Sequence, residues 1–590
     1  MRFVVGSRQS RAERFERRLA QRASASEVVP ETASPGAIPP RLPPLTAGHA
    51  RHDAAWPDLL NPTPSVAVDE AALRKALAFS FIAEDEAGAI AAALDVAPLS
   101  PSSFDPECFF RELFVAPLVR HCMRARLDGE PAQLHEGYVL RVLSQPPAEL
   151  AVTLHRQQLW RALLADGEAR AALGTLHRSL GALFRLLRGE GQLGIRGEHA
   201  RRRLDILKRL HALFEQLAAP AFERSESALS RLSQFAARVR ATDGYARLCD
   251  LLHYERERAF ADLTVQLAAD GSIRALRLHA LREDKQSRYH TPLIVRWLGR
   301  TWLWLKGYRV GEAEVLDRWL DQVFEGLSEF LPALVQLSGD VDVLLAGLAF
   351  HDTCVMRGMA VCFPEFAAAH EPEQLESLFN PLLFALEVKP VPCSLAPGQS
   401  PCTTLITGPN SGGKTRLLQA LGIAQLLAQA GMVVPAARAR LRAVPGIFAS
   451  LTQETSAEQP EGRLGTELLR IRMLFERAEL GSLLLVDELC SGTSPSEGEE
   501  LFRMVLELLA ELRPSAFVST HFLAFAAELA RHPAGLTLHF VQVQLDADER
   551  PTYQFMPGVA ATSLARRTAQ RLGVTHEELR ALVAAKVRQH

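Results

Sequence analysis

Apolar residues recur at helical spacing through the first half of the chain, from about residue 71 to residue 365. The pattern is clearest in residues 159–187 and 315–348, where an apolar side chain returns every three or four positions, as on one face of an α-helix. Helix-forming residues dominate the same stretches. We therefore expect a mostly α-helical region between residues 70 and 375.

One segment of this region departs from the helical pattern. Between residues 263 and 281, apolar residues alternate with other residues on either side of the turn dipeptide Asp270-Gly271. Alternation with a period of two around such a turn is typical of a β-hairpin. The pattern predicts a small β insertion between long helices.

The pattern changes again after about residue 379, where short β-rich runs alternate with helical stretches. This alternation predicts βαβ units and a largely parallel sheet. A later pair of β-rich runs flanks a polar turn and indicates an antiparallel hairpin at the edge of that sheet. The fold class is thus multidomain, with an α/β domain at residues 376–558 after the helical region. The buried strands are expected at residues 403–407, 483–487 and 516–519, and the hairpin at residues 536–545 and 553–556.

The first 65 residues differ from the rest of the chain. Residues 2–22 are rich in Arg, and residues 30–64 contain repeated Pro with few large apolar side chains. Such a segment buries too little apolar surface to offset the entropy of ordering it. We expect a disordered, basic and proline-rich tail over residues 1–65, and a nucleic-acid-binding arm or a targeting peptide remains an alternative.

Composition narrows the class of protein. At about 150 residues per domain, a chain of 590 residues allows about four domains. The net charge of −2 argues against a surface that binds polyanions throughout. Eight scattered cysteines form no C-x-x-C pair, which predicts a reducing compartment, the cytoplasm, and no zinc site. Three Gln residues interrupt the longest apolar run, residues 417–437, so we expect a buried helix there and no membrane span.

The segment with the most specific chemistry joins a predicted strand to a predicted helix. It has the pattern G-x-x-x-x-G-K-T and comprises Gly408, Pro409, Asn410, Ser411, Gly412, Gly413, Lys414 and Thr415. Glycines at the end of a strand let backbone N–H groups close around phosphate oxygens, and the helix N-terminus adds the positive end of its dipole. We expect an ATP site in which Lys414 reaches the β- and γ-phosphates and Thr415 ligates Mg²⁺.

Two further strand ends carry companion residues. The strand at residues 483–487 ends in Asp487 and Glu488, where the first can hold the Mg²⁺ hydration shell and the second can orient or deprotonate the attacking water. The strand at residues 516–519 leads to His521, which is placed to sense the γ-phosphate. Together with the glycine-rich loop, these residues predict an ATPase with Lys414, Glu488 and His521 in catalysis.

At these residues the chain resembles the ATPase of the MutS family, in the ABC class. The resemblance rests on Gly408-Pro409-Asn410, Gly413-Lys414-Thr415, Asp487-Glu488-Leu489, Gly492-Thr493 and Thr520-His521-Phe522. Pro495-Ser496-Glu497-Gly498 and residues 563–573 are more similar to the second bacterial MutS branch, whose members often end in an Smr nuclease domain. Because this chain stops shortly after that point, we expect no such nuclease domain here.

The resemblance implies an architecture and partners. The helical region at residues 70–375 would form the core, lever and clamp around double-stranded DNA, either mismatched or branched. Residues 559–590 would be a helix-turn-helix segment that clasps the second protomer of a homodimer. The implied function is a DNA-binding ATPase of mismatch repair or recombination, with a clamp whose arms are gated by ATP binding and hydrolysis.

Cys490 and the turn at residues 462–467 depart from the family pattern, and a third site matches a family motif in different surroundings. Cys490 stands where the family usually has Gly after the two acids. The turn at residues 462–467 is poor in Ser and Thr and leaves Thr466 as a candidate N-cap of a helix that points at the partner's γ-phosphate. Phe110-Arg111-Glu112 matches the family's mismatch-reading Phe-x-Glu, but its helical surroundings argue against that role.

A basic run allows two interpretations. It either contacts phosphates of a nucleic acid or forms an ordinary solvated helix face. The run comprises Arg185, Arg188, Arg196, Arg201, Arg202, Arg203, Lys208 and Arg209.

The main alternative function is a nucleotide-gated scaffold that hardly hydrolyses ATP and acts on branched nucleic acid or ribosomes. The degenerate turn near Thr466 favours it, and the intact Glu488 argues against it. An ABC transporter subunit has no support, because the long helical half has no place in that architecture.

Overall fold

The computed structural model describes part of the chain. The described residues are 38, 51–52, 56–82, 88–188, 198–256, 260–267, 273–282, 312–368, 371–396, 401–451, 462–490, 494–533, 535–561 and 574–589. The chain divides into two compact units, Met1–Ile38 and Pro39–His590, and all described residues except Ile38 belong to the second. The predictions for the start of the tail, for Gly492-Thr493 and for residues 563–573 therefore lie outside the described residues.

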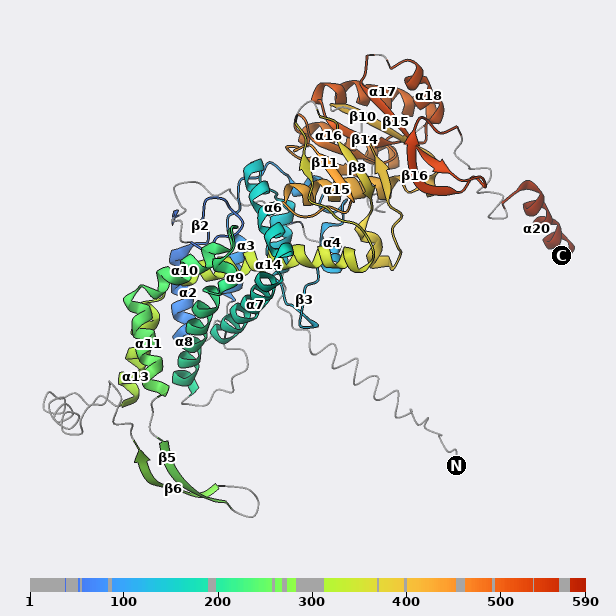
Figure 1. Cartoon of the computed structure of the whole chain (residues 1–590). Helices are drawn as coiled ribbons and strands as arrows, with labels where there is room; N and C mark the ends of the chain where they lie inside the picture. The colour runs from blue at the N-terminus through green and yellow to red at the C-terminus, as the bar shows by residue number, and fades with distance from the viewer. Residues whose placement is uncertain are drawn as a thin grey trace, which may run out of the picture. The chain divides into compact units, whose positions relative to one another are not determined.

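Helices fill the N-terminal half of the second unit, as the apolar periodicity predicts (Figure 1). Only short turns, or a single capping residue such as Asp166, separate several of the long helices along the sequence. Asp166 accepts hydrogen bonds from the backbone N–H groups of Glu168 and Ala169 and so begins the long helix α7. The helices are α2 (Glu70–Ile82), α3 (Ala89–Val96), α4 (Val115–Cys122), α5 (Glu136–Ser144), α6 (Leu150–Ala165), α7 (Gly167–Leu187), α8 (Glu198–Leu217), α9 (Pro220–Glu223), α10 (Ser230–Arg240), α11 (Asp243–Arg256), α13 (Glu312–Glu325) and α14 (Leu331–Met356).

Helix α14 forms the centre of this half. It is long and apolar enough to span a membrane, but 94% of its most apolar window is buried inside the protein, against helices α2 to α7. Close packing needs a small residue on its surface: a Cβ added at Gly347 would lie 2.6 Å from Nε1 of Trp160, which donates a hydrogen bond to the Leu344 carbonyl. Its length and hydropathy are therefore those of a core helix.

The predicted β insertion is present between α11 and α13. Strands β5 (Phe260–Leu267) and β6 (Ile273–Arg282) pair antiparallel, with register shifts near both ends. Two much shorter antiparallel pairs had no signal in the sequence, because each strand has only two residues. These are β1 (Arg51–His52) with β2 (Ser65–Val66), and β3 (Arg126–Leu127) with β4 (Glu130–Pro131).

The predicted tail extends too far. Trp56, Leu59 and Leu60 are buried, and the Leu59 N–H donates a 3.1 Å hydrogen bond to Asp340 on α14. Arg231 on α10 donates to the backbone carbonyls of the same segment. The prediction of disorder over residues 56–65 was wrong because three large apolar side chains anchor this short, proline-containing segment to the helical core.

The basic run includes residues whose role is structural. Arg202 is almost fully buried, and its guanidinium donates hydrogen bonds to the carbonyls of Ser80 and Leu187 at the C-terminal ends of α2 and α7. Arg203 is also buried and pairs with Asp321 at 2.8 Å. Neither interpretation of the run, phosphate contact or solvated face, fits these two arginines, whereas Arg196 lies outside the described residues.

The Phe-x-Glu match is likewise structural. Phe110 is buried, and Glu112 accepts a hydrogen bond from the backbone N–H of Leu451 at 2.9 Å. Glu112 thereby connects the helical half to the end of a strand in the C-terminal half. A role in base reading, which the sequence argued against, has no support in this geometry.

The C-terminal half is built around a six-stranded sheet of order β12-β13-β14-β10-β15-β16. The first five strands run parallel, and β16 pairs antiparallel with β15, which matches the predicted βαβ pattern and hairpin. Helices α15 (Lys414–Gln429), α16 (Gly462–Arg477), α17 (Pro495–Leu512) and α18 (Leu523–Arg531) connect these strands. The strands are β10 (Cys402–Thr407), β12 (Ile447–Ser450), β13 (Leu483–Val486), β14 (Ser515–Ser519), β15 (Leu538–Leu545) and β16 (Pro551–Pro557), and helix α20 (His576–Gln589) follows later.

A second, four-stranded sheet was not predicted. Its order is β7-β11-β8-β9, with β7 (Glu365–Phe366), β8 (Gln374–Leu378), β9 (Cys393–Leu395) and β11 (Arg438–Leu441). Its strands are short, and α15 separates β9 from β11 in the sequence, so no local run predicts their pairing.

Helix α15 connects the two halves of the unit. It contacts strands β13 and β14 on one side and helices α5 and α6 on the other, and nearly all of its residues are buried. At its C-terminal end the Gln429 carbonyl accepts a 2.9 Å hydrogen bond from Thr153 on α6. A displacement of α15 would therefore reach the helical half directly.

Candidate nucleotide site

The G-x-x-x-x-G-K-T segment forms a tight loop between β10 and α15. All six residues of β10 are buried, so the strand delivers the loop to the edge of the sheet. Gly408 and Gly413 have φ values of 137° and 84°, which residues with a Cβ rarely adopt, and residues 410–412 form one 3-10 turn between them. The glycines at both ends of the loop are thus required by the backbone conformation.

The loop also lies close to β15. A Cβ added at Gly408 or Gly412 would approach a methyl carbon of Val543 to 2.7 or 2.8 Å. Pro409 is buried, whereas Asn410 and Ser411 are exposed. The loop therefore has one face against the sheet and an exposed tip.

Lys414 is the first residue of α15 and points back across the loop. Its ammonium donates hydrogen bonds to the carbonyls of Gly408 at 3.0 Å and Pro409 at 3.2 Å, and to the Asn410 side chain at 3.4 Å. Burial lowers the pKa of Lys414, and the nearby carboxylates of Glu488 and Asp487 act in the opposite direction. A buried cation is thus held at the centre of the loop, where it is available to an anion.

Thr415 and Asp487 are in contact although 72 positions separate them. The Thr415 hydroxyl donates to one carboxylate oxygen of Asp487, and the Ser519 hydroxyl at the end of β14 donates to the other. Asp487 directly follows β13, Ser519 ends β14, and Thr415 lies in the first turn of α15, after the neighbouring strand β10. They meet because parallel strands end at the same edge of the sheet. A hydroxyl and a carboxylate that face one another in this way suit a hard cation such as Mg²⁺, which takes oxygen ligands and keeps several waters.

Glu488 follows Asp487 in a constrained conformation. Its φ is 50°, in the left-handed region, and its backbone N–H donates to the Ser519 hydroxyl at 3.0 Å. Non-glycine residues hold such a conformation only where the surroundings enforce it, and they gather at functional sites. Ser519 thus positions both acids, a role that the sequence pattern did not predict.

His521 lies at the same edge of the sheet, just after the end of β14. It follows β14, is exposed, and has its ring centroid 4.2 Å from that of Phe522. Within the described residues it forms no hydrogen bond with the loop or with Glu488. Its predicted role as a sensor of the γ-phosphate stays a prediction.

The two departures from the family pattern have different outcomes. Cys490 is buried with φ 61°, the conformation that favours Gly, and burial raises the pKa of its thiol to about 12. The prediction that Thr466 is an N-cap was wrong, because α16 begins at Gly462 and places Thr466 inside the helix. The helix therefore begins about one turn before the N-cap position that the sequence predicted.

A largely apolar pocket of about 300 Å³ opens beside the loop. Gly412, Gly413 and Arg416 form one wall, and Tyr553 and Phe555 from β16 form another. A Cβ at Gly413 would lie 3.3 Å from the Tyr553 ring. The size and the aromatic side chains suit a heterocyclic base, since bases stack on aromatic rings. Sequence reasoning missed this pocket because its two walls are about 140 positions apart in the chain.

Comparison with known proteins agrees with the motifs. The family model of MutS domain V matches residues 404–585, which include the loop, both acids and His521. A protein of Thermus thermophilus called Endonuclease MutS2 is 34% identical over 278 residues, which cover 47% of this chain and 36% of that protein. The Endonuclease MutS2 of Thermomicrobium roseum is 30% identical over 307 residues, or 51% of this chain and 38% of that protein.

The matched part is therefore limited to a little over a third of the length of these curated relatives. A further Endonuclease MutS2, from Streptococcus sanguinis, is 38% identical over 176 residues, or 29% of this chain and 22% of that protein. Residues 404–585 thus match a domain of the MutS family, and the similar proteins belong by name to its second branch.

Proposed function

We propose that this chain is a DNA-binding ATPase of mismatch repair or recombination that acts as a homodimeric clamp in the cytoplasm. The observation that carries the proposal is the convergence of Lys414, Thr415, Asp487 and Glu488 at one edge of the parallel sheet. Endonuclease activity appears in the name of relatives that this chain matches only in part, and it is not included in the proposal.

Different residues bind the phosphates, the base and the metal ion of MgATP. Lys414 and the backbone of residues 408–413 bind the phosphates, and the pocket beside Tyr553 takes the adenine. Thr415 and Asp487 would hold Mg²⁺, which would supply charge neutralisation at the phosphates. His521 reports on the γ-phosphate from the end of β14.

Glu488 orients the attacking water and accepts its proton. A carboxylate suits this role only if it is fixed, and the hydrogen bond from the Glu488 N–H to Ser519 fixes the backbone from which the side chain extends. The bond between the γ-phosphorus and the bridging oxygen breaks as the water oxygen attaches to phosphorus. The products are ADP and phosphate, and the DNA remains covalently unchanged.

Helix α15 supports a link from nucleotide to DNA. Its first residue, Lys414, contacts the phosphates in this proposal, and its last residue, Gln429, is hydrogen bonded to α6. We assign residues 70–375 to the core, lever and clamp, residues 376–558 to the ATPase domain and residues 559–590 to dimerisation. ATP binding then moves α15 and the helical arms with it.

Exposed apolar side chains support a homodimer. On α16 these are Leu468, Leu469 and Met473, each more than 40% exposed, and on α20 they are Leu579, Leu582 and Val583. Exposed apolar groups of this kind mark surfaces that are covered by a partner. A second copy of the chain would bury them.

The rate of ATP hydrolysis with different DNA partners tests the proposal. We expect a mismatched duplex or a four-way junction to raise the steady-state rate several-fold above the rates without DNA and with homoduplex. The stimulation should fall as salt rises from 50 to 200 mM, because Lys and Arg contacts with phosphates release counterions. A low rate that none of these DNAs changes would contradict the proposal and favour the non-hydrolysing scaffold.

A further inference from the structure

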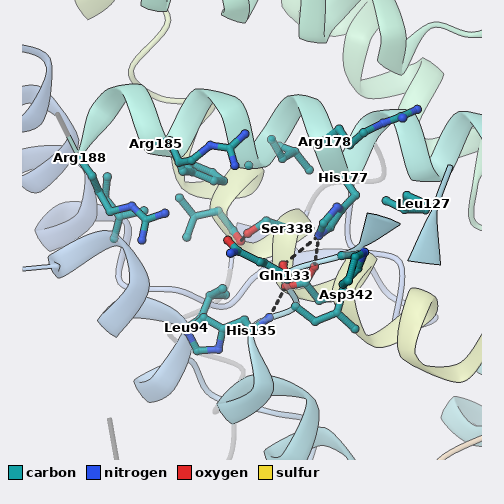
Figure 2. A pocket seen from close by; sticks show the side chains of 18 of the residues that line it. Leu94, Leu127, Gln133, His135, His177, Arg178, Arg185, Arg188, Ser338 and Asp342 are labelled. Carbon is teal, nitrogen blue, oxygen red and sulfur yellow. Dashed lines mark hydrogen bonds and ion pairs between the residues drawn. The ribbon is translucent and has the colours of Figure 1, made fainter. Parts of the chain in front are cut away.

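The helical half contains a second pocket, which shares no residue with the nucleotide site. Its volume is about 480 Å³, and it lies between α7, α3, α14 and the segment that follows β4 (Figure 2). Cavities of this size hold small molecules of the size of a nucleotide or a drug. Neither the proposed ATPase nor the proposed DNA clamp assigns it a role.

One face of α7 forms the wall that carries charge. His177, Gly181, Arg185 and Arg188 follow one another at spacings of four, four and three, which places them on the same side of a helix. Figure 2 shows Arg185 and Arg188 extending from this helix beside the pocket, with Leu94 and His135 on the opposite side. The sequence pattern therefore aligns three cationic or protonatable groups along one cavity.

Asp342 fixes the orientation of the His177 ring. Its carboxylate lies 3.2 Å from Nε2 of His177 and also accepts the backbone N–H of His135 at 2.8 Å. The same Nε2 lies 3.2 Å from the Gln133 carbonyl, and because a carbonyl can only accept, Nε2 carries the proton. The other ring nitrogen, Nδ1, is buried and has no hydrogen-bond partner among the described residues. The His177 ring is thereby held in one orientation among the residues that line the pocket.

Two of the arginines on this wall differ in their partners. Arg178 is held by Asp128 at the turn between β3 and β4. No described residue forms a hydrogen bond or ion pair with the guanidinium of Arg185, although it lines the pocket. An unpaired guanidinium beside a cavity is the group that proteins use to bind phosphate and carboxylate.

Gly181 lies on the same wall of the pocket, between His177 and Arg185, and leaves space there because it has no side chain. A Gly in the middle of a helix destabilises it by about 1 kcal/mol relative to Ala. A Cβ added at Gly181 would meet nothing within 4 Å among the described residues, so none of them requires the glycine. The missing side chain enlarges the pocket between His177 and Arg185.

The remaining lining is largely apolar. It includes Leu94, Leu127, Leu134, Leu180, Phe184 and Val335. An apolar body would rest on these side chains while its anionic group faced the α7 wall. We propose that this pocket binds a small organic anion, a phosphate or carboxylate carried on an apolar or aromatic body.

Fluorescence titration of the full chain with naphthalene probes tests this site. We expect 1-naphthyl phosphate or 1-naphthoate to bind with one molecule per chain, and uncharged 1-naphthol at least tenfold more weakly. Arg185→Glu should weaken binding of the anion at least tenfold. Gly181→Leu should abolish it, because the new side chain extends from the wall of the pocket; its Cβ meets nothing within 4 Å, and Leu is a better helix former than Gly. The tighter of the two anions identifies the ligand chemistry.

Arg247→Glu is the matched control, since Arg247 is exposed on α11, away from the pocket. Its affinity for the probe should equal that of the unmodified chain. The proposal is wrong if no anion binds saturably at millimolar concentration, if Arg185→Glu and Arg247→Glu bind alike, or if ATP displaces the probe. Displacement by ATP would place the probe in the nucleotide site and leave the proposed function intact.

Discussion

Replacing Lys414 with Ala is expected to weaken ATP binding by about a hundredfold or more. The ammonium is buried inside the glycine-rich loop and already donates to Gly408, Pro409 and Asn410, so it is prepositioned for phosphate oxygens. Each hydrogen bond between charged partners contributes about 1.5–3 kcal/mol, and two such bonds correspond to roughly 10²- to 10⁴-fold in affinity. Titration with a fluorescent ATP analogue measures the change.

Lys75→Ala is the control for this variant. Lys75 is exposed on α2 and does not line either pocket, so its replacement should leave the affinity for ATP unchanged. Thermal unfolding of both variants verifies that the fold is kept. If Lys414→Ala binds ATP as tightly as Lys75→Ala does, the glycine-rich loop is not the phosphate site.

Replacing Glu488 with Gln should lower the rate of ATP hydrolysis by roughly 10²- to 10⁴-fold, the usual contribution of a general base. ATP binding should remain, because Glu488 makes no predicted contact with the phosphates and its backbone bond to Ser519 is kept in the variant. The variant should therefore accumulate in the ATP-bound form. Single-turnover hydrolysis and nucleotide binding, measured on the same preparation, separate the two effects.

The same substitution at Glu511 provides the comparison. Glu511 is exposed on α17, and Glu511→Gln should hydrolyse ATP at the rate of the unmodified chain. Unchanged turnover in Glu488→Gln would remove Glu488 from the mechanism. A loss of ATP binding in that variant would instead show that the carboxylate acts on the site's structure.

The sequence predicted the edge of the sheet well because strand ends are encoded locally. A short apolar run followed by a polar residue marks the carboxyl end of a buried strand, and parallel strands end together. The contact between Thr415 and Asp487 and the nearness of Glu488 follow from that rule, although their catalytic roles remain predictions. Ser519 follows from it as well, but a single Ser is too common to be singled out by pattern.

Features that depend on distant pairings were missed. The pocket beside Tyr553 needs the hairpin β15–β16 to fold against a loop far back in the chain. The four-stranded sheet has strands as short as two residues, which carry no periodic signal. In both cases the information lies in tertiary packing and not in any window of the sequence.

Charge patterns were misread where the charge is buried. Arg202 lies in a run of basic residues, which predicts a solvated or nucleic-acid-binding face. The structure instead uses its guanidinium to satisfy the free carbonyls at the ends of α2 and α7. Sequence spacing does not reveal which arginine of a run lies beside a helix end.

Fluorescence anisotropy of a labelled four-way junction and a labelled mismatched duplex tests the coupling of nucleotide to DNA most directly. The Kd of each DNA is measured with a slowly hydrolysed ATP analogue, with ADP and without nucleotide. We expect at least a tenfold difference in Kd between the ATP analogue and ADP for one of these DNAs, because α15 joins the phosphate loop to the helical half. The difference should disappear in Lys414→Ala. Equal Kd values in all three nucleotide states would contradict a clamp gated by ATP.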